Sequence, residues 1–197
     1  MRVRMTLVGT SALLMHNARL SDPTDEFAMA IAELTSKSDK TIQDQQEIAR
    51  LEFCGGLYIG ANGPMVPAAN LKKTLVNAAK ARREGKKVER ALMPVTAEIT
   101  LQYKGPRTPD ALWADDRYRA RMAVRVGKAR IWRMRPRFID WSLESEWELL
   151  EDLMNLKALV RIGTEAGMTE GLCDGRTQGF GRFICEVQVP GSAKEAA

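Results

Sequence analysis

The sequence has little of the chemistry on which many enzymes depend. Its 197 residues include a single histidine, His16, so acid-base catalysis by a pair of histidines is excluded. The three cysteines, Cys54, Cys173 and Cys185, are odd in number and lack metal-ligand spacing, which favours neither a disulfide framework nor a zinc site. We therefore expect no metal and no cofactor.

Long apolar runs are also missing. No stretch approaches the length of a membrane span, and the opening residues MRVRMTLVG lack the apolar run of a secretory signal. We therefore expect no membrane association and a cytoplasmic location. Hydrophobic residues make up 45% of the chain, which is enough for one buried core. We expect a single domain over residues 1–190 and a disordered tail over residues 191–197.

Positive charge is concentrated in two segments, although the net charge is only +5. Residues 103–137 contain eleven Lys or Arg and three Asp, so this segment is more positive than the whole chain. Residues 72–90 contain eight basic and two acidic residues. Basic clusters with aromatic neighbours suit phosphate neutralisation and base stacking, whereas the alternative is an ordinary solvated surface. The aromatic neighbours are Trp113, Tyr118, Trp132 and Phe138.

Alternation of apolar and polar residues predicts the strands, and apolar spacing with capping residues predicts the helices. A pair of strands turning at Gly127 and Lys128 is typical of a hairpin. The predicted strands cover residues 2–8, 96–103, 119–126, 128–134, 138–150 and 183–189. The predicted helices cover residues 21–37, 41–53, 66–85 and 152–167.

Two segments interrupt a simpler order of elements. Without the early helices at about 20–60 and the basic β-hairpin at 104–137, the order is strand, helix, strand, strand, helix, strand. This βαββαβ order predicts an α+β protein with a ferredoxin-like sheet, an arrangement shared by RNA-recognition (RRM-like) folds. The basic hairpin is then a thumb-like insertion between the second and third core strands.

The ferredoxin-like arrangement also predicts what lies on the open face of the sheet. Its first strand lies antiparallel to its third, so Arg2 and Arg4 should face Glu144, Glu146 or Glu148. An RNA-recognition motif displays stacking aromatics at such positions, and here the outward residues are charged or small. Nucleic acid is therefore expected to bind through loops and the hairpin insertion.

The stretch GLCDGRTQGFGRF, residues 171–183, is rich in glycine directly before the last predicted strand. Glycines allow positive backbone angles and let main-chain amides approach an anionic backbone, while Arg176 supplies charge and Gln178 can bond a sugar or base edge. The alternative is a flexible connection between a helix and a strand. The dinucleotide-binding fingerprint is a poorer match, because it follows a strand and opens a helix.

This loop is similar to the glycine-rich loop of the RAMP superfamily, which comprises CRISPR-associated proteins built on ferredoxin-like domains. The family loop has glycine, a hydrophobic residue and glycine, then about five residues often including a basic one, then glycine, a hydrophobic residue and glycine. Five residues here match it, DGRTQ supplies the basic Arg176, and Cys173 stands in place of a glycine. The resemblance rests on this loop and the element order and says little about residues 10–60. The matching residues are Gly171, Leu172, Gly179, Phe180 and Gly181.

The resemblance implies a role in binding RNA. Backbone subunits of that superfamily polymerise along a guide RNA and grip it with a basic inserted thumb. We therefore expect a non-catalytic protein that binds single-stranded RNA or DNA and assembles side by side along it, as a homo-oligomer or as a subunit of a CRISPR or phage complex. The expected binding residues are Lys72, Lys73, Arg121, Arg125, Trp132, Arg133, Arg135, Arg137, Phe138, Arg176, Gln178 and Arg182, with the loop glycines Gly171, Gly175, Gly179 and Gly181. Trp132 or Phe138 is expected to stack on a base.

Two alternatives remain open. Processing subunits of the superfamily cut RNA without metal, and a metal-independent endoribonuclease here would use His16 with a second proton-transfer group such as Tyr58 or a lysine. The other alternative is a phage structural or adaptor protein whose basic hairpin binds a protein partner.

Overall fold

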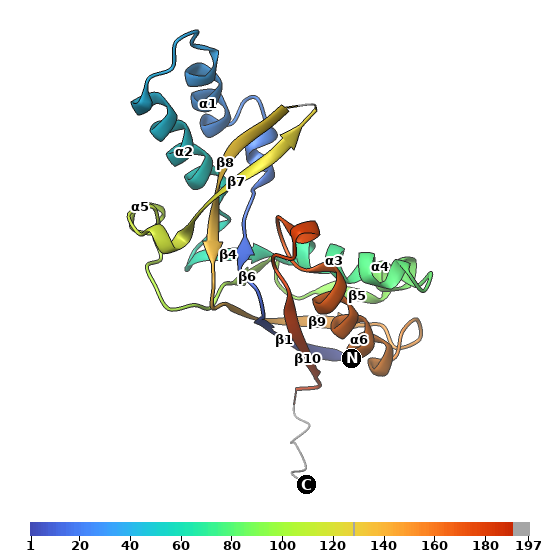
Figure 1. Cartoon of the computed structure of the whole chain (residues 1–197). Helices are drawn as coiled ribbons and strands as arrows, with labels where there is room; N and C mark the ends of the chain where they lie inside the picture. Colours follow the sequence, from blue (N-terminus) through green and yellow to red (C-terminus); the bar gives the residue numbers. More distant parts are fainter. Residues whose placement is uncertain (128, 191–197) are drawn as a thin grey trace.

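The protein is a mixed α+β molecule built from antiparallel sheets and surrounding helices (Figure 1). A computed structural model gives the structure of residues 1–127 and 129–190. Lys128 and the predicted tail at 191–197 lie outside these described residues. Within the described ranges, no helix has both the length and the apolar character needed to cross a membrane.

The central sheet has four antiparallel strands in the order β10-β1-β9-β5. Apolar side chains that alternate along these strands point to one face, where α3 (Ala68–Lys80) and α6 (Leu156–Glu165) cover them. Val3, Met5 and Leu7 of the first strand are fully buried there. The strands are β1 (Arg2–Gly9), β5 (Leu92–Pro94), β9 (Ser142–Leu149) and β10 (Phe183–Gln188).

The other face of this sheet carries a ladder of ion pairs, as the sequence predicts. Arg2 lies opposite Glu148 and Arg4 opposite Glu146 in the register of β1 with β9. Arg2 Nη2 is 2.8 Å from Glu148 Oε1, and Arg4 Nη2 is 3.2 Å from Glu146 Oε1. Since these pairs are largely exposed, they add little to stability, but they leave no stacking platform on this part of the sheet.

The predicted position of the second core strand is wrong. Residues 96–103 contribute only β6 (Glu98–Thr100), which pairs with β4 (Gly63–Pro67) in a separate sheet that also contains β3 (Ile59–Gly60). The strand beside β9 is instead β5, which has three residues and is too short to show an alternating pattern. It follows directly after α4 (Gly85–Ala91), a helix that was not predicted, because the predicted helix ends at residue 85.

The early helical segment projects away from the central sheet (Figure 1). After β2 (Leu13–Leu14) and a 3-10 turn at Ala18–Ser21, it forms α1 (Glu26–Ser36) and α2 (Ile42–Gly56). Asp25 caps α1, four residues after the predicted start of this helix at residue 21. Thr41, the first residue of the predicted helix 41–53, caps α2: its hydroxyl accepts the Asp44 amide, and the Asp44 carboxylate accepts the Thr41 amide, which completes a capping box.

The basic insertion forms the predicted hairpin, with β7 (Arg119–Val126) paired along its length to β8 (Ala129–Phe138). A short helix α5 (Pro109–Trp113) and a 3-10 turn at Asp116–Tyr118 lead into it. At its base β2 pairs with the end of β8, and α2 packs alongside (Figure 1). The base of the hairpin therefore contacts β2, which follows β1, and β2 in turn bridges through Leu14 to Asp174 in the loop that precedes β10.

Candidate nucleic-acid interface

The glycine-rich loop has the backbone conformation that glycine favours. Its positive φ angles are 76° at Gly171, 69° at Gly175, 88° at Gly179 and 70° at Gly181. Residues Arg176–Gln178 form a 3-10 turn between two of these glycines, and this turn presents Thr177 and Gln178 to solvent. The glycine-rich loop therefore has a defined turn structure between the helix and the last strand.

Most of its glycines are required by packing within the protein. A Cβ on Gly181 would lie 2.1 Å from the Leu172 carbonyl oxygen, whereas a Cβ on Gly179 would meet nothing within 4 Å. The amide nitrogens of residues 172, 174 and 178–181 all donate to carbonyl oxygens of the chain. The expectation that loop amides reach an anionic backbone is therefore wrong for these positions, and charge recognition falls to the side chains.

Cys173 occupies the position at which the RAMP pattern has glycine, and it keeps a positive φ of 62°. Cys173 thus adopts the left-handed backbone conformation, although glycine adopts it at lower energetic cost. Burial raises the pKa of the Cys173 thiol to about 12, so it remains protonated at neutral pH and does not act as a thiolate nucleophile.

A small pocket of about 170 Å³ opens between this loop and the start of α3. Four separate parts of the chain meet there: the segment after β2, the segment after α2, the first turns of α3, and the glycine loop. Both Lys73 and Arg176, two predicted binding residues, line it together with His16. The complete lining is His16, Tyr58, Asn70, Lys73, Thr74, Cys173, Asp174 and Arg176.

Hydrogen bonds hold the walls of this pocket in place. The Tyr58 hydroxyl donates to the His16 carbonyl oxygen at 3.1 Å, and Thr74 Oγ1 donates to the Gly171 carbonyl oxygen at 3.1 Å. Asn70 hydrogen-bonds through its side chain to Tyr58 and to Cys173. Asn70 and Thr74 were not predicted as site residues. Their polar side chains in the first turns of a predicted helix were the feature of the sequence that could have indicated them.

Two ion pairs connect the hairpin to the surroundings of His16. Arg135 Nε donates to Asp174 Oδ2 at 2.8 Å, and Arg133 Nη1 donates to Glu52 Oε1 at 2.5 Å. Glu52 lies on α2, is only 4% exposed, and also accepts the Met134 amide at 2.8 Å. The hairpin, α2 and the glycine loop are therefore joined by charge as well as by packing.

These charges and burial set the protonation state of His16. Burial lowers the pKa of His16, and the nearby Arg135 lowers it further, whereas Asp174 and Glu52 oppose that change. Its Nδ1 is buried without a hydrogen-bond partner among the described residues. His16 is therefore a neutral imidazole at pH 7, able to accept a proton when an anion or a hydroxyl enters.

The lowered pKa of His16 predicts a loss of stability in mild acid. In the unfolded chain the His16 imidazole has a pKa near 6.5 and therefore binds a proton more tightly than in the folded protein. The contribution of neutral His16 to the free energy of unfolding is thus complete above pH 6.5 and is lost as the pH falls through the folded pKa. Urea unfolding of the wild type and of His16→Asn at pH 7.5 and pH 5.5 checks this. The wild type should lose more stability between the two pH values; equal losses would contradict the assignment.

Several predicted phosphate ligands are not available for that role. Arg135 is 7% exposed and paired with Asp174, and Arg133 is paired with Glu52, because their side of the hairpin faces α2 and the glycine loop. Phe138 is 1% exposed in the aromatic core, so its expected stacking on a base is wrong. These three assignments are corrected accordingly.

Other predicted residues are separated from the pocket or partly engaged. Lys72 points away from it, with its Nζ 3.6 Å from Met93 Sδ on the strand after α4. Arg137 Nε donates to the Arg117 carbonyl oxygen at 3.0 Å. Arg182 Nη2 donates to the Arg176 carbonyl oxygen at 3.3 Å, which places Arg182 beside the loop as predicted.

The opposite side of the hairpin is largely exposed, although Arg121 borders a hollow shared with α2. Arg121, Arg125 and Trp132 lie on it, and the Trp132 side chain is 61% exposed. The Arg121 guanidinium lies 5.4 Å from the centre of the Trp132 ring. Arg130, which the sequence analysis did not select, faces Arg125 across the strands and is also exposed. We call this set, Arg121, Arg125, Arg130 and Trp132, the outer hairpin face.

Among residues 1–127 and 129–190, no group of three His, Cys, Asp or Glu side chains is placed to bind a metal ion.

A scan against models of protein families finds no match to the chain, and a search of curated proteins finds no matching sequence. The candidate interface is therefore interpreted from its own geometry.

Proposed function

We propose that this protein binds single-stranded RNA or DNA without cutting it, along a path from the glycine loop to the outer hairpin face. The observation that carries the proposal is the convergence of Lys73 and Arg176 with neutral His16 in one pocket beside the hairpin base. Two cationic side chains can neutralise one phosphate, and a neutral imidazole can donate its one N–H to a phosphate oxygen.

The dimensions of the pocket support a phosphate more than a larger ligand. Its volume of about 170 Å³ is below the roughly 300–1,000 Å³ of typical sites for small organic molecules. The outer hairpin face supplies the complementary element, because Trp132 offers an exposed ring for a base and three arginines offer charge to the backbone. Unpaired bases are needed for such stacking, which favours single strands over duplex.

We further propose that the central sheet is a ferredoxin-like core with two insertions, related to the RAMP superfamily. The strand order β10-β1-β9-β5 with α3 and α6 on one face supports this assignment. The glycine loop directly precedes the last strand, where the RAMP loop lies. By this resemblance the protein assembles side by side along its strand, and a cytoplasmic CRISPR or phage complex is its proposed setting.

Fluorescence anisotropy with labelled single-stranded RNA, single-stranded DNA and duplex DNA, across a salt series in EDTA, tests the proposal. Tight binding to single strands that remain intact is expected. With five phosphate contacts, the slope of log affinity against log salt should be about −3.5. Absence of binding at low salt would overturn the proposal and favour a structural or adaptor protein whose hairpin contacts another protein.

A metal-independent endoribonuclease is the second candidate, because the same pocket holds His16, Tyr58 and Lys73. His16 would accept the proton of a 2′-hydroxyl whose oxygen attacks the adjacent phosphorus. Burial raises the pKa of Tyr58, so this phenol remains protonated and would donate its proton to the departing 5′-oxygen. Lys73, which lines the same pocket, is the other candidate donor. The products would be a 2′,3′-cyclic phosphate and a 5′-hydroxyl.

Gel analysis of the RNA after the binding assay decides between the two candidates. Cleavage in EDTA that His16→Ala abolishes, with a 2′-deoxy strand left intact, would establish the nuclease and overturn the non-catalytic proposal. Intact RNA with the wild-type protein would exclude the nuclease.

A further inference from the structure

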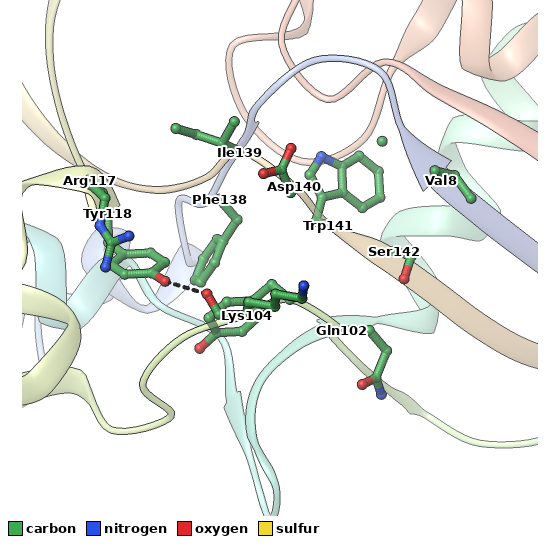
Figure 2. Close-up of a pocket in the computed structure, with 12 residues that line it drawn as sticks. Val8, Gln102, Lys104, Arg117, Tyr118, Phe138, Ile139, Asp140, Trp141 and Ser142 are labelled. Atoms are coloured by element: carbon green, nitrogen blue, oxygen red, sulfur yellow. Dashed lines mark hydrogen bonds between the residues drawn. The ribbon is translucent and has the colours of Figure 1, made fainter.

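A larger hollow of about 720 Å³ lies on the other side of the hairpin base and has no part in the interface described above. It is bounded by the end of β1, the segment that follows β6, the start of β7 and the turn between β8 and β9 (Figure 2). Its lining is Val8, Gly9, Gln102, Tyr103, Lys104, Arg117, Tyr118, Phe138, Ile139, Asp140, Trp141 and Ser142.

The floor of this hollow is a rigid group of aromatic rings. Tyr103 and Phe138 have ring centres 4.8 Å apart, and Tyr118 and Phe138 have ring centres 5.9 Å apart. The Tyr118 hydroxyl donates to the Lys104 carbonyl oxygen at 2.8 Å, and the Tyr103 hydroxyl donates to the Pro106 carbonyl oxygen. Because both hydroxyls are engaged, the rings present apolar edges in fixed positions.

Arg117 at the edge of this floor pairs with Asp115, whereas three other polar side chains are unengaged. Within the part of the chain that the structure describes, Gln102, Lys104 and Asp140 are exposed and form no side-chain hydrogen bond or ion pair. Figure 2 shows Asp140 and Lys104 on opposite sides of the hollow. Val8 and Ile139, which are 52% and 53% exposed, add apolar surface at its edge. The three rings are tilted by 56–65° to one another, and Tyr118 and Phe138 are nearly buried, so much of the exposed apolar surface lies at the edge of the hollow. An apolar hollow between an unpaired anion and an unpaired cation is suited to a planar ligand with both donors and acceptors.

We propose that this hollow binds a guanine base of the bound strand, an inference that rests on the proposed function. Guanine has two adjacent N–H donors, N1–H and N2–H₂, which match the two oxygens of the Asp140 carboxylate. Its O6 and N7 are acceptors, which a lysine or arginine contacts in many guanine sites. Adenine and the pyrimidines lack that combination of edges.

The hollow lies close to the proposed path of the strand. Trp141 Nε1 donates to the Ser11 carbonyl oxygen at 2.9 Å, and Ser11 Oγ donates to the Gly179 carbonyl oxygen at 2.9 Å. The Arg182 amide in turn donates to Ser11 Oγ at 2.9 Å. A single residue, Ser11, therefore links the Trp141 wall of the hollow to the glycine loop, which allows one strand to reach both.

Isothermal titration of the full chain with the 5′-monophosphates of guanosine, inosine, adenosine, cytidine and uridine tests this inference. GMP should bind at least tenfold more tightly than AMP, CMP or UMP. IMP, which lacks the N2 amino group, should fall between GMP and AMP. Asp140→Asn should remove the preference for GMP, whereas the matched control Asp152→Asn, at another exposed aspartate, should retain it.

Oligonucleotides separate the failure of this inference from failure of the proposed function. Single strands of adenine with and without one central guanine are measured against wild type and Asp140→Asn. Tight binding of both strands with no guanine preference would overturn the guanine site and leave the strand-binding proposal intact. Binding of GMP without binding of any strand would overturn the proposed function instead. Equal binding of all five mononucleotides, or none, would overturn the guanine site.

Discussion

Replacing Glu52 with alanine should lower the free energy of unfolding by about 3–5 kcal/mol. Glu52 is 4% exposed, and its two carboxylate oxygens accept from the Arg133 guanidinium and from the Met134 amide. Its removal leaves the Met134 amide and the Arg133 guanidinium without their partner, and because the Arg133 side chain is only 34% exposed, water replaces the lost contacts only in part. This loss is a large part of the total stability of a typical domain.

Urea unfolding followed by circular dichroism gives the measurement, with Glu47→Ala as its matched control. Glu47 lies on the same helix and pairs with Arg50 at 3.1 Å, but both side chains are largely exposed. The control should therefore lose less than about 1 kcal/mol. The double variant Glu52→Ala with Arg133→Met should recover part of the loss, since it removes the unpaired charge. A loss below 1 kcal/mol for Glu52→Ala alone would show that the pair is solvated.

The double charge reversal Lys73→Glu with Arg176→Glu should weaken binding of a single strand at least 100-fold at low salt. Each side chain is expected to contact phosphate in the His16 pocket, and a hydrogen bond to a charged group contributes about 1.5–3 kcal/mol. Loss of two contacts should also flatten the dependence of log affinity on log salt by about 1.4. Anisotropy in a salt series measures both quantities.

Lys86→Glu with Lys87→Glu is the control for this prediction. It changes the net charge of the protein by the same amount, and both lysines are exposed on α4, outside the pocket. Its affinity should change far less, and its salt slope should remain that of the wild type. Equal effects of the two double variants would show that only overall charge matters and would remove the pocket from the binding path.

Local patterns were sufficient to predict much of the fold. The alternation of charged and apolar residues in β1 and β9 predicts both their buried faces and the contacts of Arg2 and Arg4 with glutamates. The hairpin follows from two alternating runs around Gly127, and the start of α2 from the capping residue Thr41. Each of these features depends on neighbouring residues or on one simple strand pairing.

Features that depend on distant contacts were not predictable in the same way. Nothing in the alternation of residues 96–103 states which strand they pair with, and the three residues of β5 have no detectable period. Arg133 and Arg135 look like any other hairpin arginine until α2 and the glycine loop are placed beside them. Lys73, Arg176 and His16 were each selected from the sequence for separate reasons, and only the structure shows that they line one pocket.

The positive φ of Cys173 has a consequence for how the glycine loop can change during evolution. A non-glycine residue pays a strain of about 1–2 kcal/mol in this region, and here the chain tolerates it without losing the shape of the loop. Loop shape and glycine content are thus partly independent, and Gly179, where an added Cβ would meet nothing within 4 Å, is the loop glycine whose replacement leaves the backbone path free of clashes. Distant relatives of this protein are then better recognised by a succession of positive φ angles before the last strand than by the letters of the loop.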